Sequence, residues 1–437
     1  MVNNDLPANS CSPTSVLSHH LLRLCFMSQT TRILFALIVG IAVGIGGARM
    51  GWSGAAAIAE PIGNLWLDSL RMTVVPLVVS LLITGIARAA DSARGGKLAL
   101  RSVLLFVTLL WLVTLIAAFL VPALLRLWPL PAEAAAALNA ALGQTTQAVG
   151  AAPGLADFLK SIIPTNPIAA AADDAMLPLI LFATLFAIAV TRLEPEARDR
   201  ITGLFSAIEQ AMLEIVNWVL WIAPIGVFAL AFVVGMKAGT AAIGALAHYI
   251  VIVSCAGLAA WALAYPMAVF GGRVRLRDFV RAVAPAQAVA LSTQSSLASL
   301  PAMLRGCQQL GVATEVAGVP LPIAVAIFRV TSPAMNLAVA LYVAHWMGIS
   351  LSAGAIAAGA VVAAITTMGS ISLPGQVSFL TSVTPIALAM GVPLHPLALL
   401  IAVEMIPDLV RTIGNVTMDV AATTALGRRQ QEDLSHL

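Results

Sequence analysis

The chain has 437 residues, of which 60% are apolar and only 10% are charged. Soluble domains carry roughly 25% charged residues, so this composition excludes an ordinary water-soluble domain and indicates a protein solvated by a bilayer. The formal net charge of +3 is small and gives no reason to expect nucleic acid as a partner. The four cysteines are scattered without metal-binding spacing, and no metal site is predicted.

The first 27 residues differ from the rest. Residues 3–18 are polar and aperiodic, which is typical of a disordered tail. The apolar stretch that follows is too short to span a bilayer and lacks a signal-peptide cleavage site. Met27 stands just before the first long apolar run and is a candidate initiator beside Met1. We therefore expect residues 1–27 to be a disordered extension, which a start at Met27 would leave untranslated.

Long charge-free runs fill most of the remaining sequence. A transmembrane helix needs about 20 apolar residues. The clearest runs cover 33–48, 102–125, 215–236, 241–272 and 330–403. Further apolar stretches lie near 61–87, 175–191 and 396–426. Together they predict an all-α integral membrane protein with eight transmembrane helices and some apolar sequence left over.

Positive charges predict the orientation, because cytoplasmic loops are enriched in Lys and Arg. Three clusters lie in alternate loops, and further arginines flank the two ends. The members are Arg88, Arg94, Lys97 and Arg101; Arg192, Arg198 and Arg200; Arg273, Arg275, Arg277 and Arg281; and Arg23, Arg32, Arg428 and Arg429. Both termini are therefore expected in the cytoplasm, with residues 429–437 as a cytoplasmic tail.

Two apolar segments contain polar or helix-breaking centres. Residues 282–312 contain STQSSLASLP at 292–301, and residues 352–390 contain GSISLPG at 369–375. Irregular backbone at membrane depth survives only inside protein or beside a polar cavity. We interpret the two segments as re-entrant helical hairpins in an inverted-repeat transporter. The alternative is two ordinary spans that are kinked by proline.

The last apolar segment carries a polar stripe. Its members fall at i, i+4, i+7, i+11 and i+15: Glu404, Asp408, Arg411, Asn415 and Asp419. At 100° per residue they lie within about 80° of one helix face. Each ionised group is costly at membrane depth, so this face is expected to meet protein interior or an aqueous cavity.

Recognition of a small solute explains the stripe best. Arg411 offers a planar fork that grips a carboxylate through two hydrogen bonds. Asp408, one turn earlier, can accept an ammonium group, and Thr412 lies beside the stripe. The alternative is a ladder of internal salt bridges, in which Asp408 pairs with Arg411 or shares a proton with Glu404.

Arg329 is a further charge in an apolar segment. Pro322 and Pro333 flank it and Ser332 is close by, which predicts a broken helix whose unwound part reaches the cavity. Pairing of Arg329 with Asp419 or Glu404 is expected. The five charges in these segments then comprise two positive and three negative groups.

Several motifs in chain order resemble the dicarboxylate/amino acid:cation symporter family, which includes the glutamate and aspartate transporters. They are MTVVPLVVSLLITG at 72–85, the PTNP-containing region at 161–190, IVNWVLWIAPIGVFAL at 215–230, QSSLASLP at 294–301 and DLVRTIGNVTMD at 408–419. The last is similar to the family's D-x-x-R-T-x-x-N-x-x-x-D helix. The resemblance covers nearly all of residues 30–428.

The resemblance implies a homotrimer that works by an elevator mechanism, in which one part of each subunit moves past a fixed scaffold. The transporter domain would span residues 28–428. The scaffold would comprise approximately 30–96 and 128–236, and the transport core approximately 97–127 and 241–428.

The resemblance also implies roles by position. Asp408 would bind the substrate amine and Arg411 its side-chain carboxylate. Thr412 and Asn415 would bind the region of the main carboxylate or amine. Donors would come from Ser295 and Ser296 of the first hairpin, and Ser332 is counted with this set. Leu373, Pro374 and Gly375 would form an outer gate, and Asp419 lies where the family places a sodium ligand.

The seventh span departs from the family's N-M-D-G-T motif. Here the aligned residues are Phe328, Arg329, Val330, Thr331 and Ser332. Both oxygen ligands are lost and a fixed cation is gained, so bound sodium should be repelled. Leu110 and Trp111 also stand where hydroxyls are expected in the third span, and Leu297 replaces a hairpin serine. Our hypothesis is that Arg329 substitutes for a bound cation.

The predicted function is secondary active transport of acidic amino acids or C4-dicarboxylates across the cell membrane. The coupling ion, H+ or Na+, stays open, with Arg329, Glu404 and Asp419 as the residues involved. Proton coupling through Glu404 and sodium-independent exchange are both compatible with the seventh-span motif. A non-transporting receptor and an anion channel of the same fold are further alternatives. No catalytic motif or cofactor-binding motif indicates an enzyme.

Overall fold

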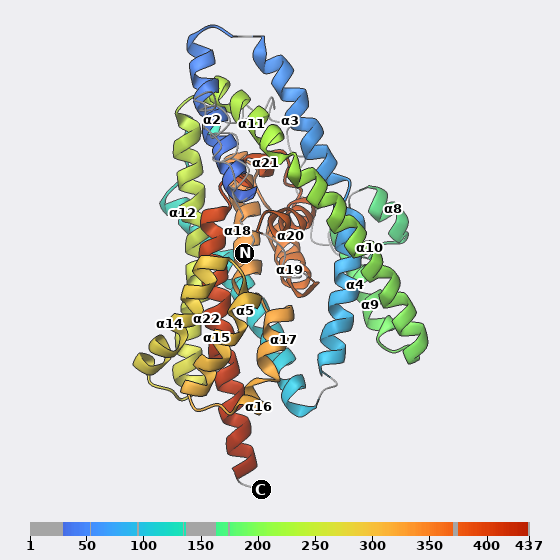
Figure 1. Ribbon diagram of the computed structural model, residues 1–437. Coiled ribbons are helices and arrows are strands. Elements are labelled where there is room, and N and C mark those ends of the chain that lie inside the picture. The colour runs from blue at the N-terminus through green and yellow to red at the C-terminus, as the bar shows by residue number, and fades with distance from the viewer. Residues whose placement is uncertain are drawn as a thin grey trace, which may run out of the picture.

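The computed structural model describes residues 29–52, 54–93, 96–133, 135–136, 163–173, 175–369 and 375–435. Within these ranges every regular element is a helix, which confirms the predicted all-α class (Figure 1). The expected disordered extension over residues 1–27 lies outside the described residues.

The described residues up to Ala262 form helices, most of them long. They are α2 (Gln29–Arg49), α3 (Ala55–Arg71), α4 (Val74–Ala93), α5 (Lys97–Leu127), α8 (Pro167–Ala172), α9 (Met176–Val190), α10 (Pro195–Trp221), α11 (Ala223–Ala238) and α12 (Ala241–Ala262). Asn166 caps α8, because its side chain accepts hydrogen bonds from the Ile168 and Ala169 amides, and Pro167 occupies the first helical position.

The second half contains more, and shorter, elements. They are α13 (Ala264–Pro266), the π-helix η1 (Met267–Gly271), α14 (Leu276–Thr293), α15 (Ser296–Gln309), α16 (Thr314–Ala317), α17 (Pro320–Ile327), α18 (Thr331–Trp346), α19 (Ala353–Gly369), α20 (Gly375–Ala389), α21 (Leu397–Leu400) and α22 (Met405–Ser435). Several of these are halves of what the sequence presents as one apolar run.

Five stretches of the described residues are long and apolar enough to cross a membrane, and a sixth is the pair α10 and α11, bent by 55° at their junction. The five stretches are 32–49, 55–91, 97–127, 242–271 and 314–346. Shorter apolar helices cover 176–190, 353–368 and 379–389. The eight-span count therefore stays a prediction, while a multi-pass arrangement agrees with these helices.

Glycines bring α2 and α11 into close contact. A Cβ atom on Gly44 would lie 2.3 Å from the Phe232 carbonyl oxygen, and one on Gly235 would lie 2.4 Å from the Ile41 carbonyl oxygen. Small residues allow such backbone-to-backbone approach between helices in a bilayer, where packing rather than the hydrophobic effect drives association.

Two helix pairs occupy the predicted hairpins. In the first, α14 ends at Thr293, the following Gln294 has a φ of 52°, and α15 begins at Ser296. Gly306 of α15 faces the Ala282 carbonyl oxygen of α14, and a Cβ there would approach it to 2.7 Å. In the second pair, α19 and α20 pack against each other, and the predicted tip at 370–374 lies outside the described residues.

A break separates α17 from α18, as the flanking prolines predict. Residues 328–330 are not helical, and Phe328 is extended, with φ −111° and ψ 94°. The Phe328 ring stacks on Phe106 of α5, with ring centroids 4.4 Å apart. Every residue of α18 except His345 is buried, so α18 forms the centre of the core.

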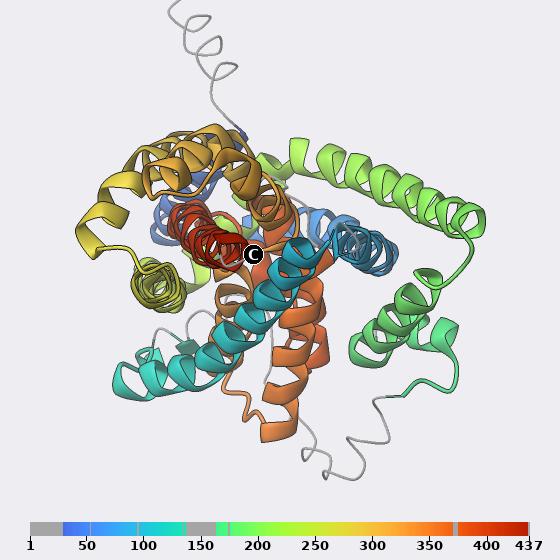
Figure 2. The ribbon, with the colours of Figure 1, turned by 90° about the horizontal axis from the view of Figure 1, so that it is seen from below.

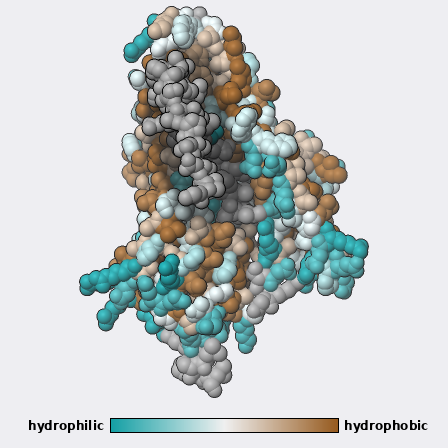
Figure 3. Space-filling model, viewed as in Figure 1, coloured by the Kyte–Doolittle hydropathy of each residue, from teal (hydrophilic) through white to brown (hydrophobic). Residues whose placement is uncertain are grey.

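The arrangement places several links at one end of the molecule. The end of α4, the beginnings of α5 and α14, and the C-terminal part of α22 lie toward the lower end of Figure 1. From below, α5 crosses the molecule obliquely, and α9 and α10 stand to one side of it (Figure 2). On the face in Figure 3, hydrophilic side chains gather mainly in the lower half.

Candidate functional site

The polar stripe predicted for the last helix faces the protein interior. Glu404, Arg411, Asn415 and Asp419 are each 1% exposed, and Asp408 is 6% exposed. Helix α22 carries the stripe, with Glu404 in the turn that joins it to α21. Contacts with α12, α14, α15, α17 and α18 surround this face. The charges therefore lie within the protein, as their energetic cost at membrane depth requires.

Arg411 forms ion pairs with two carboxylates of the same stripe, Glu404 and Asp408. Its Nη2 donates to Glu404 Oε1 at 2.6 Å, and its Nε lies 3.7 Å from Asp408 Oδ1. The Nε and Nη1 atoms make no hydrogen bond within the described residues. One guanidinium nitrogen, Nη2, is thus hydrogen-bonded, and the other two, Nε and Nη1, can still donate to further acceptors.

Tyr249 completes the environment of Glu404. From its place on α12, its hydroxyl donates a hydrogen bond to Glu404 Oε2, with 3.0 Å between the two oxygens. Because Arg411 donates to Oε1, each carboxylate oxygen of Glu404 has a donor. Tyr249 is not among the residues predicted from the sequence. The signal was present, since a phenol hydroxyl inside an apolar span needs a hydrogen-bond partner.

The unwound segment meets the stripe through Thr331. Its backbone amide donates to Asn415 Oδ1 at 3.0 Å. Its hydroxyl lies 2.8 Å from the same oxygen and 3.0 Å from the Arg411 carbonyl oxygen. Gly414 permits this contact, because a Cβ there would lie 2.5 Å from Thr331 Cγ2 and 3.1 Å from Trp261 Cβ. Asn415 Nδ2 makes no hydrogen bond within the described residues and is a candidate donor to a ligand.

Arg329 lies in the unwound segment and is partly buried. It interacts electrostatically with Asp408 and Asp419 of α22, and with the like charge of Arg411. Asp419 accepts no hydrogen bond from the described residues through either carboxylate oxygen. Arg329 acts electrostatically on Asp419, and the expected pairing of the two stays a prediction.

The first hairpin presents its serines at the start of α15. Ser295 caps this helix, because its hydroxyl accepts from the Ala298 amide at 3.2 Å, and Ser296 is buried. The hairpin is fixed to α22 by a hydrogen bond from Gln287 Nε2 to Thr417 Oγ1 at 2.9 Å. Leu297, at the position where the family carries a third serine, is exposed.

The remaining predicted residues differ in burial and in their hydrogen bonds. Thr412 is buried, and its hydroxyl donates to the Asp408 carbonyl oxygen at 2.9 Å. Ser332 is buried on α18, with no hydrogen bond to its hydroxyl within the described residues. Gly375 is the first residue of α20. Leu373 and Pro374 lie outside the described residues.

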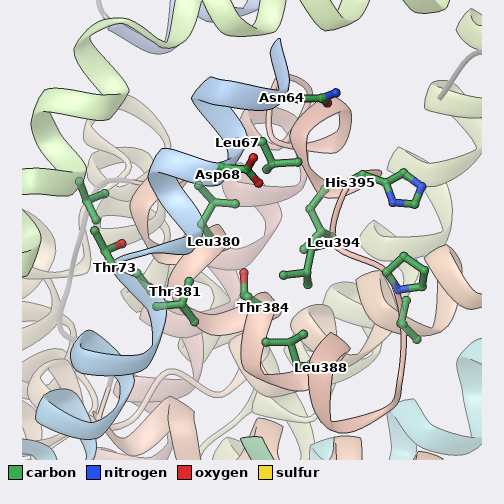
Figure 4. A pocket seen from close by; sticks show the side chains of 15 residues that line it. Asn64, Leu67, Asp68, Thr73, Leu380, Thr381, Thr384, Leu388, Leu394 and His395 are labelled. Carbon is green, nitrogen blue, oxygen red and sulfur yellow. The ribbon is translucent and has the colours of Figure 1, made fainter. Parts of the chain in front are cut away.

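A separate cavity of about 410 Å³ lies away from the stripe (Figure 4). Helices α3 and α4 border it on one side, and α20 with the loop before α21 on the other. Its polar lining includes Asn64, Asp68, Thr73, Thr381 and His395. Within the described ranges, no three His, Cys, Asp or Glu side chains come together to hold a metal ion.

Comparison with known proteins places the chain among transport proteins. Residues 30–429 match the model of the sodium:dicarboxylate symporter family. The chain is 26% identical over 416 residues to the proton/glutamate-aspartate symporter of Escherichia coli (strain K12), covering 92% of each chain. It is 28% identical over 412 residues to the proton/sodium-glutamate symport protein of Bacillus subtilis (strain 168), covering 91% of this chain and 92% of the relative.

A third relative is named for a different substrate. The chain is 23% identical over 424 residues to C4-dicarboxylate transport protein 1 of Pseudomonas aeruginosa (strain UCBPP-PA14), covering 94% of this chain and 90% of the relative. The three names differ in substrate and coupling ion, but all describe transport.

Proposed function

The chain belongs to the sodium:dicarboxylate symporter family, and on this premise we propose that it transports acidic amino acids or C4-dicarboxylates by secondary active transport. It is a multi-pass membrane transporter and not an enzyme, since the family consists of symporters. The named relatives divide between glutamate or aspartate and C4-dicarboxylates.

The observation that carries this proposal is the buried guanidinium of Arg411. Its Nε and Nη1 have no hydrogen-bond acceptor among the described residues, although the side chain is 1% exposed. Buried charged donors without partners are costly. A carboxylate of the solute could accept from either nitrogen, and the bidentate contact that arginine favours would also use Nη2, which Glu404 occupies here.

Asp408 favours an amino acid over a plain dicarboxylate. Its carboxylate lies one turn before Arg411 on the same face, where it can accept an ammonium group. We assign the second carboxylate to Thr412 and Asn415, with donors from Ser295 and Ser296, and count Ser332 with them. Leu373, Pro374 and Gly375 are proposed as the outer gate.

We propose proton coupling through Glu404. This carboxylate accepts from Arg411 Nη2, so it occupies part of the fork that a solute carboxylate would use. Protonation of Glu404 weakens that ion pair and makes the fork available. The proton comes from the aqueous side on which the solute enters, and it leaves with the solute on the other side.

Sodium is not required in this proposal. Sodium needs several oxygen ligands around it, and the proposal is supported by the electrostatic interaction of the Arg329 guanidinium with Asp419. A fixed cation of this kind would also repel a second one. The same observation favours sodium-independent exchange as the second candidate function.

We further propose a homotrimer with an elevator mechanism in the plasma membrane, with both termini cytoplasmic. The orientation is supported by the positive-inside rule, because the links that carry the arginine clusters lie toward one end of the molecule (Figure 1). Light scattering of the purified protein tests the trimer, and accessibility of cysteines introduced at the two ends tests the orientation.

Uptake into proteoliposomes tests the function. We expect concentrative uptake of L-aspartate, L-glutamate, succinate or malate under an inward proton gradient, and no added effect of a sodium gradient. Arg411→Ala should abolish uptake of acidic solutes, while Arg277→Ala, an exposed arginine on α14, should not. Strong sodium dependence would contradict the coupling proposal, and unchanged L-aspartate binding by Arg411→Ala would contradict the site. Current without saturable uptake would indicate a channel.

A further inference from the structure

A second polar cluster adjoins Glu404 through α12. His248 precedes Tyr249 in this helix, and both side chains are buried. His248 Nε2 lies 2.9 Å from the Trp128 carbonyl oxygen, just beyond α5, and His248 Nδ1 lies 3.2 Å from the Tyr342 hydroxyl on α18. The imidazole therefore connects three helices close to the candidate site.

Counting the hydrogens that these contacts need as hydrogen bonds gives the charge of His248 that fits this arrangement. The Trp128 carbonyl oxygen can only accept, so Nε2 must carry a hydrogen. The single proton of the Tyr342 hydroxyl is donated to the Ala245 carbonyl oxygen at 2.9 Å. Tyr342 can then only accept from Nδ1, so Nδ1 must carry a hydrogen too. An imidazole with a hydrogen on both nitrogens is a cation.

The neutral form would make one hydrogen bond fewer. With Nδ1 unprotonated, Tyr342 would have to turn its hydroxyl toward the ring and release the Ala245 carbonyl oxygen. The charge on His248 therefore decides where the Tyr342 hydroxyl points.

The position of the Trp128 ring is compatible with the charged form. The indole and imidazole rings meet edge to face, with centroids 4.7 Å apart and an interplanar angle of 76°. A cation beside the π-face of tryptophan is attracted by the ring quadrupole, and more strongly where water is excluded. His248 is 4% exposed, which meets that condition.

Tyr342 transmits the state of His248 toward the site. Its ring packs edge to face against Tyr249, with centroids 5.3 Å apart, and the two phenols interact electrostatically. The Tyr249 hydroxyl in turn donates to Glu404. A continuous line of contacts thus runs from His248 to the carboxylate assigned to proton coupling.

We propose that His248 is a positioning residue whose positive charge holds the Tyr342 and Tyr249 hydroxyls in place and so sets the pH at which Glu404 takes its proton. This inference rests on the proton coupling proposed above. A hydrogen bond donated to a carboxylate favours its ionised form, and Tyr249 donates one to Glu404. Loss of the cation should therefore let Glu404 take its proton at higher pH.

Other charged groups face this cluster. His345 on α18 interacts electrostatically with His248, and Arg126 lies in the last turn of α5. Both are exposed, so solvent screens them. Asp408 and Arg411 act on Glu404 from α22. The variants below leave all four unchanged.

Tryptophan fluorescence tests the charge of His248 without any transport. Protonated imidazole quenches a neighbouring indole, so emission should rise as pH increases from 5 to 9. The chain has eight tryptophans, and Trp128→Phe isolates the contribution of one. We expect the rise to disappear in Trp128→Phe and in His248→Gln. No change in the wild type, or an unchanged rise in Trp128→Phe, would overturn the proposal.

The pH profile of uptake tests the consequence. With L-aspartate or succinate as the probe, the midpoint of the pH dependence should move upward by about one pH unit in His248→Gln. His248→Arg, which keeps a cation, should have the wild-type midpoint. If His248 had a purely structural role, His248→Arg and His248→Gln should shift the midpoint equally. The control is His395→Gln, at the separate cavity.

An unmoved midpoint in an active His248→Gln protein overturns the inference. Wild-type protein that takes up neither probe overturns the proposed function instead. The fluorescence titration then still tests the charge of His248, because it does not depend on transport. If His248→Gln does not fold, Tyr249→Phe gives a second measurement. It removes the donor to Glu404 and should also move the midpoint upward, and an unmoved midpoint there overturns the proposal as well.

Discussion

Glutamine at position 404 separates the competing roles of the buried carboxylate. Glu404→Gln keeps the size of the side chain and an acceptor for Tyr249 but removes the charge that holds Arg411 Nη2. If Glu404 occupies part of the fork that the solute needs, the variant should bind acidic solutes more tightly than the wild type at high pH. It should also lose the pH dependence of binding.

The magnitude follows from the contact that is removed. A hydrogen bond to a charged group contributes about 1.5–3 kcal/mol, which corresponds to about a 10- to 150-fold change in affinity. In the wild type only the protonated form of Glu404 releases the fork, so affinity should fall as pH rises, by at most about tenfold per pH unit for one proton. The variant should keep the low-pH affinity of the wild type throughout.

Titration calorimetry of the purified protein with L-aspartate and succinate between pH 5.5 and 8.5 measures this. A matched control is Glu209→Gln. Glu209 is also a buried carboxylate, 3% exposed, which accepts from Thr84 at 2.6 Å and pairs with Arg88 at 3.5 Å. It lies on α10, away from the stripe. Weaker binding by Glu404→Gln at every pH, with the wild-type slope retained, would refute the competition between Glu404 and the solute.

Three further substitutions address the unwound segment. Arg329→Met should abolish uptake because it leaves Asp419 without its charge partner, and uptake under a sodium gradient measures whether the ion restores it. Gly414→Ala should lower the melting temperature by several degrees, because overpacking against Thr331 costs about 1–3 kcal/mol. Thr331→Val should weaken solute binding about 5- to 30-fold, as expected for 1–2 kcal/mol, because the Asn415 amide loses a positioning hydrogen bond, and calorimetry measures it.

Matched controls exist for each substitution. Arg277→Met changes an exposed arginine, Gly203→Ala adds a methyl group where nothing lies within 4 Å, and Thr108→Val changes an exposed threonine on α5. Full uptake by Arg329→Met without sodium would contradict the role of the guanidinium. Equal melting temperatures for the two glycine variants would contradict the close contact at α22, and unaltered binding by Thr331→Val would contradict the positioning of Asn415.

Periodicity made the stripe on α22 predictable. Residues at i, i+4, i+7 and i+11 share a helix face whatever the rest of the fold does, and the cost of buried charge points that face inward. The break at 328–330 was predictable for a similarly local reason, since Pro322 and Pro333 disfavour a continuous helix there. The all-α membrane class followed from composition and was confirmed.

Contacts between distant segments were not predictable from one sequence. Tyr249 is 155 residues from Glu404, and Thr331 is 84 residues from Asn415. Each is an ordinary residue in its own helix and gains importance only from the helix packed against it. The salt bridges considered from the sequence joined residues one turn apart, namely Asp408 with Arg411 or with Glu404. The structure instead pairs Glu404 with Arg411, two turns away. The count of spans and the gate at 373–375 stay predictions.

The contact between α2 and α11 has a mechanical consequence. Where Gly44 and Gly235 bring main chain against main chain, the surfaces interlock through carbonyl groups that cannot rotate away as side chains do. Such a seam resists shear, so α2 and α11 must travel or stay together as one rigid body. Any displacement that carries the solute across the bilayer has to occur along softer boundaries, where side chains alone separate the helices.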